Sequence, residues 1–457
     1  MPNDMQIYYA ITVFSLSVFF MIWRPFGINE YIPASVGAFL ILIVGIVSLQ
    51  DVYMIFGIVS GAAITILSTI VMSIVLESVG VFHWAAHNLA VRASGSGKAL
   101  YWYTILLCFL MTMFFNNDGS ILITTPIIIK TLSMLGLKMH QKIPYLFSGA
   151  LVATAASAPI GVSNLANLIA LKIVGLDLNT YASMMFVPSM LGLIFMTYLL
   201  YILFKKQIPN RIPVLQPGSI EASRHRYAQE HKRYHPLVVN PDDKPEVDWM
   251  MFRICIGIVV LIRISFFALA PLGIPPELPA LTGAILLVAV RWWRKRIGVF
   301  DIIRNSPWHI LIFAFSTYLI VFGLHKTGIS AFLTHQMKDI ISYSSFQAIF
   351  GMGILLTIMS NLFNNLPAIM LGTLTLTEAN LSVDHMQVAY LASVIGADIG
   401  SLILPIGTLA SLIWMYIIRS HKIPFSWGEY LRITVIVIPP TLIISLLSLY
   451  LWIWLIA

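Results

Sequence analysis

Charge is scarce along this sequence. Only 10% of its 457 residues are Asp, Glu, Lys or Arg, whereas 59% are hydrophobic, and near-uncharged apolar runs recur from end to end. This scarcity excludes a soluble globular domain. The net charge of +8 does not indicate nucleic-acid binding, because the Lys and Arg residues lie between the apolar runs, where membrane orientation signals belong. The composition therefore predicts an all-α polytopic membrane protein.

Cysteine is nearly absent as well. Cys108 and Cys255 are the two cysteines, and both fall inside apolar runs, which favours small buried hydrophobic side chains over a disulfide or a thiol metal site. The polar breaks described below hold no nucleophile and base pair, metal-ligand cluster or phosphate loop, so we expect no metal, no cofactor and no enzymatic activity. The start of the chain has no basic region and no small-residue cleavage site, so the first apolar run is expected to remain as a membrane helix.

Ten apolar stretches are predicted to cross a hydrocarbon core of roughly 30 Å. They lie at residues 7–23, 34–49, 53–76, 143–174, 181–204, 250–270, 278–290, 308–324, 388–418 and 431–455. One long hydrophilic segment, 205–249, is predicted to be a linker between residues 1–204 and 250–457. Across it the sequence FNN at Phe115 recurs at Phe363, and LESVGVF resembles LHKTGIS, both at a displacement of 248 residues. This repetition indicates an internal duplication.

In each half, asparagines interrupt one apolar stretch and leave limbs of about 9 to 17 residues, a length typical of re-entrant hairpins. We predict such hairpins at 99–135 and 346–376. Each half then keeps five crossings, an odd number, so the two halves are predicted to be inverted repeats. Because Lys and Arg gather on one side of this topology, the positive-inside rule places the linker in the cytoplasm and both termini on the outer side of the membrane. The two hairpin tips then converge near the midplane.

Each half also holds one apolar helix with a break near its centre, APIGVSN at 158–164 and LPIGTLAS at 404–411. Proline removes a backbone donor, glycine permits non-helical turns, and Ser163 or Thr408 can cap the half-helix that follows. A single break would be explained by a local kink, but four paired breaks match the midplane binding sites of secondary transporters. The predicted substrate-binding residues are the amides and hydroxyls at these breaks: Asn116, Asn117, Ser163, Asn164, Asn167, Asn364, Asn365, Thr408 and Ser411.

Two carboxylates are predicted to lie deep in the membrane. Asp118 is at the first hairpin tip, and Asp398 lies roughly 15 Å into its span at 1.5 Å per residue. A carboxylate at that depth must be protonated, paired or wetted, so both are candidates for carrying a coupled proton. The alternative for each is a permanently satisfied acid bonded to nearby amides. Arg263 also lies inside a span, and it faces either a wet cleft or the outer interface. Nothing in the sequence pairs it with a break, so no Lys or Arg is expected there.

With these residues identified, the chain resembles the arsenite/antimonite efflux permeases, the ArsB family of the ion transporter superfamily. The likeness covers nearly the full length and is most specific at FNNDGSILITTPIII (115–129), SNLANLI (163–169), FNNLPAIMLGTL (363–374) and VIGADIGSLILPIGTLASLIW (394–414). The resemblance implies export of arsenite or antimonite as the neutral hydroxide in exchange for protons, with optional association with a cytosolic ATPase subunit. It also implies a bacterial inner membrane, with both termini in the periplasm. An uncharged triol needs several hydrogen-bond partners, which the amides and hydroxyls at the breaks supply.

Two other functions fit the same pattern. The chain is also similar to the sodium-coupled dicarboxylate transporters of that superfamily, although their Ser-Asn-Thr signature is altered here to Ser163, Asn164 and Leu165 in one half and to Gly407, Thr408 and Leu409 in the other. A sodium- or proton-coupled anion transporter therefore remains an alternative, and a passive channel is another. In the preferred hypothesis, the hairpins and broken helices move against a scaffold of the other spans, by an elevator or a rocking motion.

Overall fold

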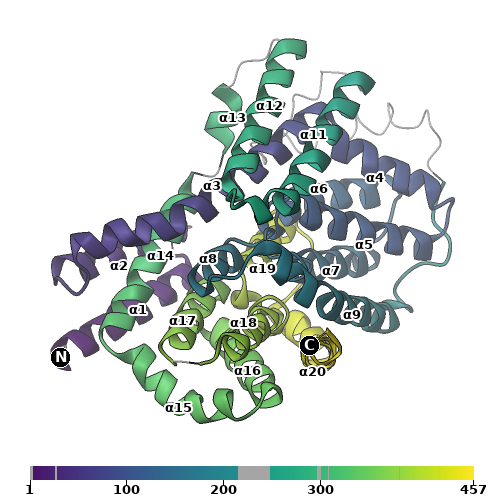
Figure 1. Cartoon of the computed structure of the whole chain (residues 1–457). Helices are drawn as coiled ribbons and strands as arrows, with labels where there is room; N and C mark the ends of the chain where they lie inside the picture. Colours follow the sequence, from purple (N-terminus) through teal and green to yellow (C-terminus); the bar gives the residue numbers. More distant parts are fainter. Residues whose placement is uncertain are drawn as a thin grey trace.

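Two runs of helices, one before residue 215 and one after residue 247, build the protein (Figure 1). The computed structural model describes residues 4–25, 28–214, 248–295, 300–306, 308–379 and 381–456. Most of the predicted linker, 205–249, lies outside these residues. Throughout the described ranges the secondary structure is helical and no β-strand forms, which confirms the all-α prediction.

The helices of the first run are α1 (Asp4–Trp23), α2 (Tyr31–Ile43), α3 (Leu49–Val79), α4 (Val81–Arg92), α5 (Gly97–Phe114), α6 (Asn117–Met134), α7 (Met139–Ala155), α8 (Leu165–Val174) and α9 (Leu178–Phe204). The helices of the second run are α11 (Trp249–Ala268), α12 (Glu277–Lys295), α13 (Phe300–Asn305), α14 (His309–Lys326), α15 (Ile329–Tyr343), α16 (Ser345–Phe363), α17 (Asn365–Glu378), α18 (Val383–Asp398), α19 (Leu409–Ser420) and α20 (Trp427–Ile456). Three short 3-10 helices complete it: η2 (Ala270–Leu272), η3 (Gly400–Ile403) and η4 (Pro405–Gly407).

Packing between the two runs is reciprocal. Helix α2 packs against α14 and α3 against α12, while α8 packs against α17 and α6 against α19. Helices α9 and α20, the last of each run, lie side by side (Figure 1). Each described α-helix of the first run has a counterpart in the second run, where only the short α-helix α13 is additional among the described residues. For each pair named above, the two counterpart helices also pack together. This pattern is the one expected of two repeats related by a two-fold axis, and the repeats and their opposite orientation in a membrane stay predictions.

Nine helical segments of the described chain are long and apolar enough to cross a membrane. They include α5 and α16, the first limbs of the two predicted hairpins, with 18 and 19 residues. These limbs are longer than expected, because each helix begins at a serine cap outside its apolar run: Ser96 accepts from the amide of Ala99, and Ser344 from that of Gln347. These helices confirm the prediction of a polytopic membrane protein. The ten crossings and the re-entrant path of the hairpins stay predictions.

Matching glycines end the long helices that lead into each hairpin. Gly80 is the C-cap of α3 at φ 86°, and Gly328 follows the C-cap of α14, Thr327, at φ 89°. Both glycines adopt the left-handed conformation, which carries no steric penalty for glycine. The two positions are separated by the displacement of 248 residues found in the sequence. Each cap turns the chain into an arm, α4 or α15, which precedes the hairpin. The two matching segments thus share a backbone conformation as well as residues, as the predicted duplication requires.

Candidate functional site

Both long helices predicted to be broken are non-α at their centres. In the first, residues 156–164 separate α7 from α8; in the second, η3 and η4 separate α18 from α19. Asn164 caps α8 by accepting from the amide of Ala166 at 3.0 Å, and Thr408 caps α19 by accepting from that of Ser411, also at 3.0 Å. The expected cap by Ser163 was wrong, because Asn164 holds the N-cap position and Ser163 lies one residue before it, where its hydroxyl has no partner among the described residues. The carbonyl of Ser163 accepts from the amide of Asn117 at 3.1 Å.

The carboxylate of Asp398 joins the two breaks. Its Oδ2 accepts from Ser157 Oγ at 2.8 Å and from Asn167 Nδ2 at 2.7 Å. Its Oδ1 accepts from Asn164 Nδ2 at 2.8 Å, and the whole residue is 1% exposed. Asp398 belongs to the second half and all three donors to the first. The geometry is that of an acid satisfied by amides, one of the two alternatives open from the sequence.

The first hairpin tip lies against the first break. The amide of Asn117 donates to the Ser163 carbonyl, and the Asn117 Oδ1 accepts from the amide of Asp118 at 2.9 Å. Asn116 caps α6 through the amide of Gly119 at 2.6 Å and donates from Nδ2 to Thr69 of α3 at 3.3 Å. The tip therefore touches both the broken helix and the long helix α3.

Several polar atoms at this junction keep unused hydrogen-bonding capacity. Ser163 Oγ and Asn167 Oδ1 are fully buried and find no partner among the described residues. The carboxylate of Asp118 is partly buried and accepts no hydrogen bond from any residue that the structure describes, and the acids Glu30 and Asp398 lie within electrostatic reach of it. Unpaired polar atoms in a membrane interior are expensive. Together they show that this junction keeps hydrogen-bonding capacity that the described residues do not use, and substrate binding there stays a prediction.

The second tip and second break form a more self-contained unit. Asn364 caps α17 and donates from Nδ2 to the Ile406 carbonyl at 3.1 Å. The hydroxyl of Thr408 donates to Ser411 Oγ at 2.9 Å, and that oxygen lies 3.3 Å from the hydroxyl of Tyr430. Asn365, the first residue of α17, is buried. Most predicted site residues in this half thus have local partners.

Two residues that bind the breaks were missed by the sequence reasoning. Ser157, which donates to Asp398, lies two residues before the proline of the first break. Asn361 donates to the Gly400 carbonyl at 2.9 Å and accepts from the amide of Leu404 at 2.7 Å, so it holds the irregular backbone of the second break. Its position inside the apolar run of α16, one helical turn before the tip, was the available signal.

The expectation that no cation lies at a break was wrong. Arg263, on α11, is 7% exposed and donates from Nε to the Phe114 carbonyl at 2.6 Å and from Nη2 to the Phe115 carbonyl. These two carbonyls end α5 at the first hairpin tip. Sequence could not reveal the contact, because Arg263 lies 149 residues from Phe114 and any residue type supplies the same carbonyl acceptor.

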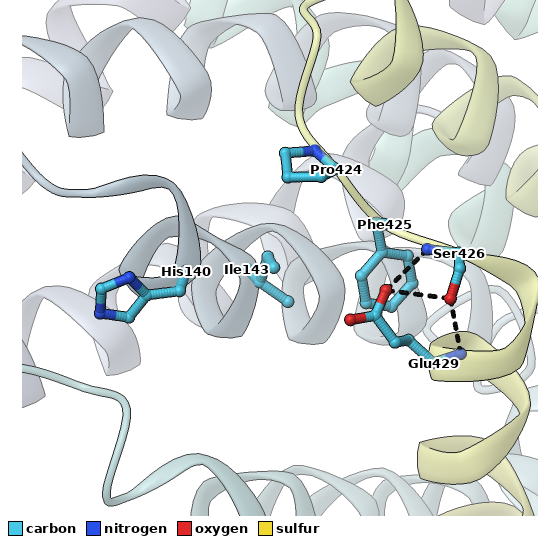
Figure 2. Close-up of a pocket in the computed structure, with 6 residues that line it drawn as sticks. All are labelled: His140, Ile143, Pro424, Phe425, Ser426 and Glu429. Carbon is cyan, nitrogen blue, oxygen red and sulfur yellow. Dashed lines mark hydrogen bonds between the residues drawn. The ribbon is translucent and has the colours of Figure 1, made fainter.

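A surface hollow of about 410 Å³ lies elsewhere, between the start of α7 and the connection from α19 to α20 (Figure 2). Figure 2 shows the carboxylate of Glu429 turned back to the amide and hydroxyl of Ser426, at 2.7 and 3.1 Å. These bonds cap α20, so the acid already has a structural role. The hollow is lined by none of the residues at the four breaks: its walls are His140, Ile143, Pro424, Phe425, Ser426 and Glu429.

The sequence profile of the arsenical pump membrane protein family, ArsB, matches residues 9–453. The chain belongs to this family. A Bacillus subtilis (strain 168) relative is 49% identical over 97% of this chain and 99% of its own length, and its description assigns it provisionally to the arsenical pump membrane proteins. An Escherichia coli relative described as an arsenical pump membrane protein is 31% identical over 96% of this chain and 97% of its own.

Among solved structures, the Alcanivorax borkumensis YdaH transporter has a similar fold, with a TM-score of 0.50 and 11% identity over 99% of this chain and 98% of that one. At this identity the likeness concerns the fold alone. Membership in the arsenical pump family makes the protein a membrane transporter rather than an enzyme. For an arsenical pump, the junction of the first tip and first break offers amide, hydroxyl and carboxylate groups that can replace water around a small polar cargo.

Proposed function

We propose that the protein exports trivalent arsenic or antimony hydroxide across the bacterial inner membrane in exchange for protons. Family membership supports arsenical efflux. The observation that carries the finer proposal is the cluster of unpartnered polar atoms at the first tip and first break, namely Ser163 Oγ, Asn167 Oδ1 and the Asp118 carboxylate. A neutral hydroxide presents O–H donors, so a site that offers spare acceptor oxygens suits it.

The other predicted binding residues take supporting roles in this proposal. Asn116, Asn364, Asn164 and Thr408 cap the helices that border the site, which fixes the backbone around the cargo. Freed amides and positive half-helix ends near these caps favour oxygen ligands. Asn117 links the hairpin tip to the break through its own amide.

The two acids are proposed to have different roles. Asp398 accepts three hydrogen bonds and thereby ties the two broken helices together. Asp118 has no such donors among the described residues, so a proton can bind or leave its carboxylate whenever water reaches it. We therefore assign proton coupling to Asp118 and a holding role to Asp398.

The hairpins and broken helices are proposed to move together against a scaffold of the remaining long helices. Because Asp398 binds donors of the other half, the two broken helices are expected to move as one body. One proton per cycle supplies about 2.3 kcal/mol per 100 mV of membrane potential. Since about 1.4 kcal/mol corresponds to a tenfold ratio, this supports more than tenfold uphill export.

Arsenite accumulation in everted membrane vesicles tests the proposal. We expect a protonophore to abolish accumulation in the wild type, and Asp118→Asn to abolish proton-driven accumulation without preventing insertion in the membrane. Asp384→Asn is the matched control, because Asp384 is an exposed acid in the first turn of α18. Accumulation that persists unchanged with the protonophore would remove proton coupling from the proposal.

One observation favours a second candidate, a sodium- or proton-coupled anion transporter. Arg263 places a guanidinium at the first tip, and its Nη1 has no partner within the described part of the chain, so an anionic oxygen could bind there. This function requires sodium-dependent inward uptake of a dicarboxylate, which is measured in right-side-out vesicles. A passive channel would dissipate an arsenite gradient but never build one. ATP-stimulated accumulation that requires added cytosol and persists in the presence of the protonophore would indicate an ATPase subunit.

A further inference from the structure

Arg263 connects the first hairpin tip to a helix from the other half of the chain. Its guanidinium donates from Nε and Nη2 to the carbonyls of Phe114 and Phe115, and it lies over the ring of Phe266 at 5.3 Å. Helix α11, which carries it, also packs against the arm α4, where the rings of Trp84 and Phe252 are 4.9 Å apart in an edge-to-face contact. The first hairpin and its arm are therefore both held by α11.

The chemistry of this contact makes it strong. The last carbonyls of a helix lack intrahelical partners and carry partial negative charge. Inside a membrane protein no bulk water replaces them, so the planar fork of an arginine satisfies two carbonyls that would otherwise be orphaned. Loss of the guanidinium therefore both removes charge-assisted bonds and leaves buried acceptors unpaired.

The second hairpin tip lacks this arrangement in the described residues. Phe363 ends α16 at the position that matches Phe115, and it meets Phe14 of α1, the counterpart of α11, through rings 5.2 Å apart in an edge-to-face contact. One tip is thus held to its neighbouring helix by a buried cation and the other by an aromatic pair. A duplicated scaffold does not require this difference, which points to a specific role for the charged contact.

We propose that Arg263 is a positioning residue that latches the first hairpin tip to α11 in the state described here. The latch must open for the tip to move, since Phe114 and Phe115 lie immediately before Asn116 and Asn117, which contact the first break. This proposal rests on the proposed transport cycle, in which the hairpins move against a scaffold that includes α11. Substrate binding at the junction would bias the latch, because the same short segment carries both contacts.

A cysteine reporter near the tip tests the latch in the full-length protein. In a background with Cys108→Ala and Cys255→Ala, the reporter Met113→Cys places a thiol near the end of α5, and the rate of its reaction with a membrane-permeant maleimide is measured. We expect Arg263→Met to raise this rate at least tenfold, which corresponds to about 1.4 kcal/mol. Arg253→Met is the matched control, because Arg253 is exposed on the same helix, and it should leave the rate unchanged.

A conservative variant separates the latch from a purely structural role. Arg263→Lys keeps the charge but cannot bond both carbonyls in the arginine's geometry, so it should raise the labelling rate by less than Arg263→Met and should change the maximal rate of arsenite transport more than its KM. Labelling within twofold of wild type in a monodisperse Arg263→Met protein would overturn the latch. If that variant does not fold, Arg263→Ala, which also removes the guanidinium, is measured in its place and judged by the same criterion.

The labelling readout is independent of the cargo. It contains no arsenite, so a protein that fails to transport arsenicals can still show an opened or an unchanged latch. Conversely, arsenite transport that survives in Arg263→Met with unaltered labelling would overturn the latch and leave the proposed function standing. The two proposals therefore fail on different measurements.

Discussion

At the first hairpin tip Asn116 caps the second limb, and at the second tip Asn364 does the same at a displacement of 248 residues. After the cap, however, the first tip continues with an acid, Asp118, where the second has Leu366. The tips also differ in a neighbouring cation: Arg263 donates to carbonyls at the first tip, and no such contact is found at the second tip among the described residues. The two tips thus share the asparagine cap that begins the second limb, whereas the charged side chains gather at the first tip, which is why we place proton coupling there.

The largest expected difference in stability is between substitutions of two acids, Asp398 at the second break and Asp118 at the first tip. Asp398→Asn turns one acceptor oxygen into a donor group among three donors, so it should destabilise the protein by about 3 kcal/mol. Asp118→Asn removes no hydrogen bond to a described residue and should leave the thermal midpoint nearly unchanged while transport is lost. Thermal unfolding of both variants in detergent measures the contrast. Equal destabilisation would contradict the division of roles.

The next largest loss of stability is expected from substitution of a glycine at a break. At Gly407 a Cβ would lie 1.9 Å from the Ser401 carbonyl oxygen, so Gly407→Ala forces the backbone apart and should cost about 2 kcal/mol. Gly161 is required for a different reason, its φ of +61°. Gly257→Ala is the control, since it is in a helix with nothing within 4 Å of the new carbon. The same thermal assay applies, and a Gly407→Ala protein as stable as Gly257→Ala would show that the second break relaxes freely.

Substitution of the two caps by glycine is expected to differ by about 1 kcal/mol. Asn116 caps α6 from extended backbone, at φ −156°, so Asn116→Gly loses a cap and gains nothing. Asn364 has φ 76° and ψ 153°, a region that disfavours any side chain, so relief of strain should offset part of the loss in Asn364→Gly. Urea-induced unfolding in detergent can rank the two variants. A larger loss for Asn364→Gly than for Asn116→Gly would contradict this account of the second tip.

How much of the fold and of the candidate site could be predicted depends on the separation in sequence between the interacting residues. The breaks could be predicted because Asn, Pro and Gly interrupt apolar runs locally, and the caps at Asn116, Asn364 and Thr408 lie within three residues of the amides they accept from. The bond between Ser157 and Asp398 spans 241 residues, and the sequence shows no pattern that pairs them. The partners of Arg263 are carbonyls, which every residue possesses. The sequence thus predicts where the chain bends but not which distant group satisfies the bend.

The smallest expected effect concerns the apolar contact at the second tip. Phe14→Leu keeps most of the buried apolar area and removes the edge-to-face pairing with Phe363, which should cost about 1 kcal/mol. Because this contact involves the second tip, maleimide labelling of Met113→Cys at the first tip should not change, in contrast to Arg263→Met. Labelling at the first tip that rises equally in Phe14→Leu would mean that the two tips open together, since the aromatic pair would then restrain both hairpins rather than its own alone.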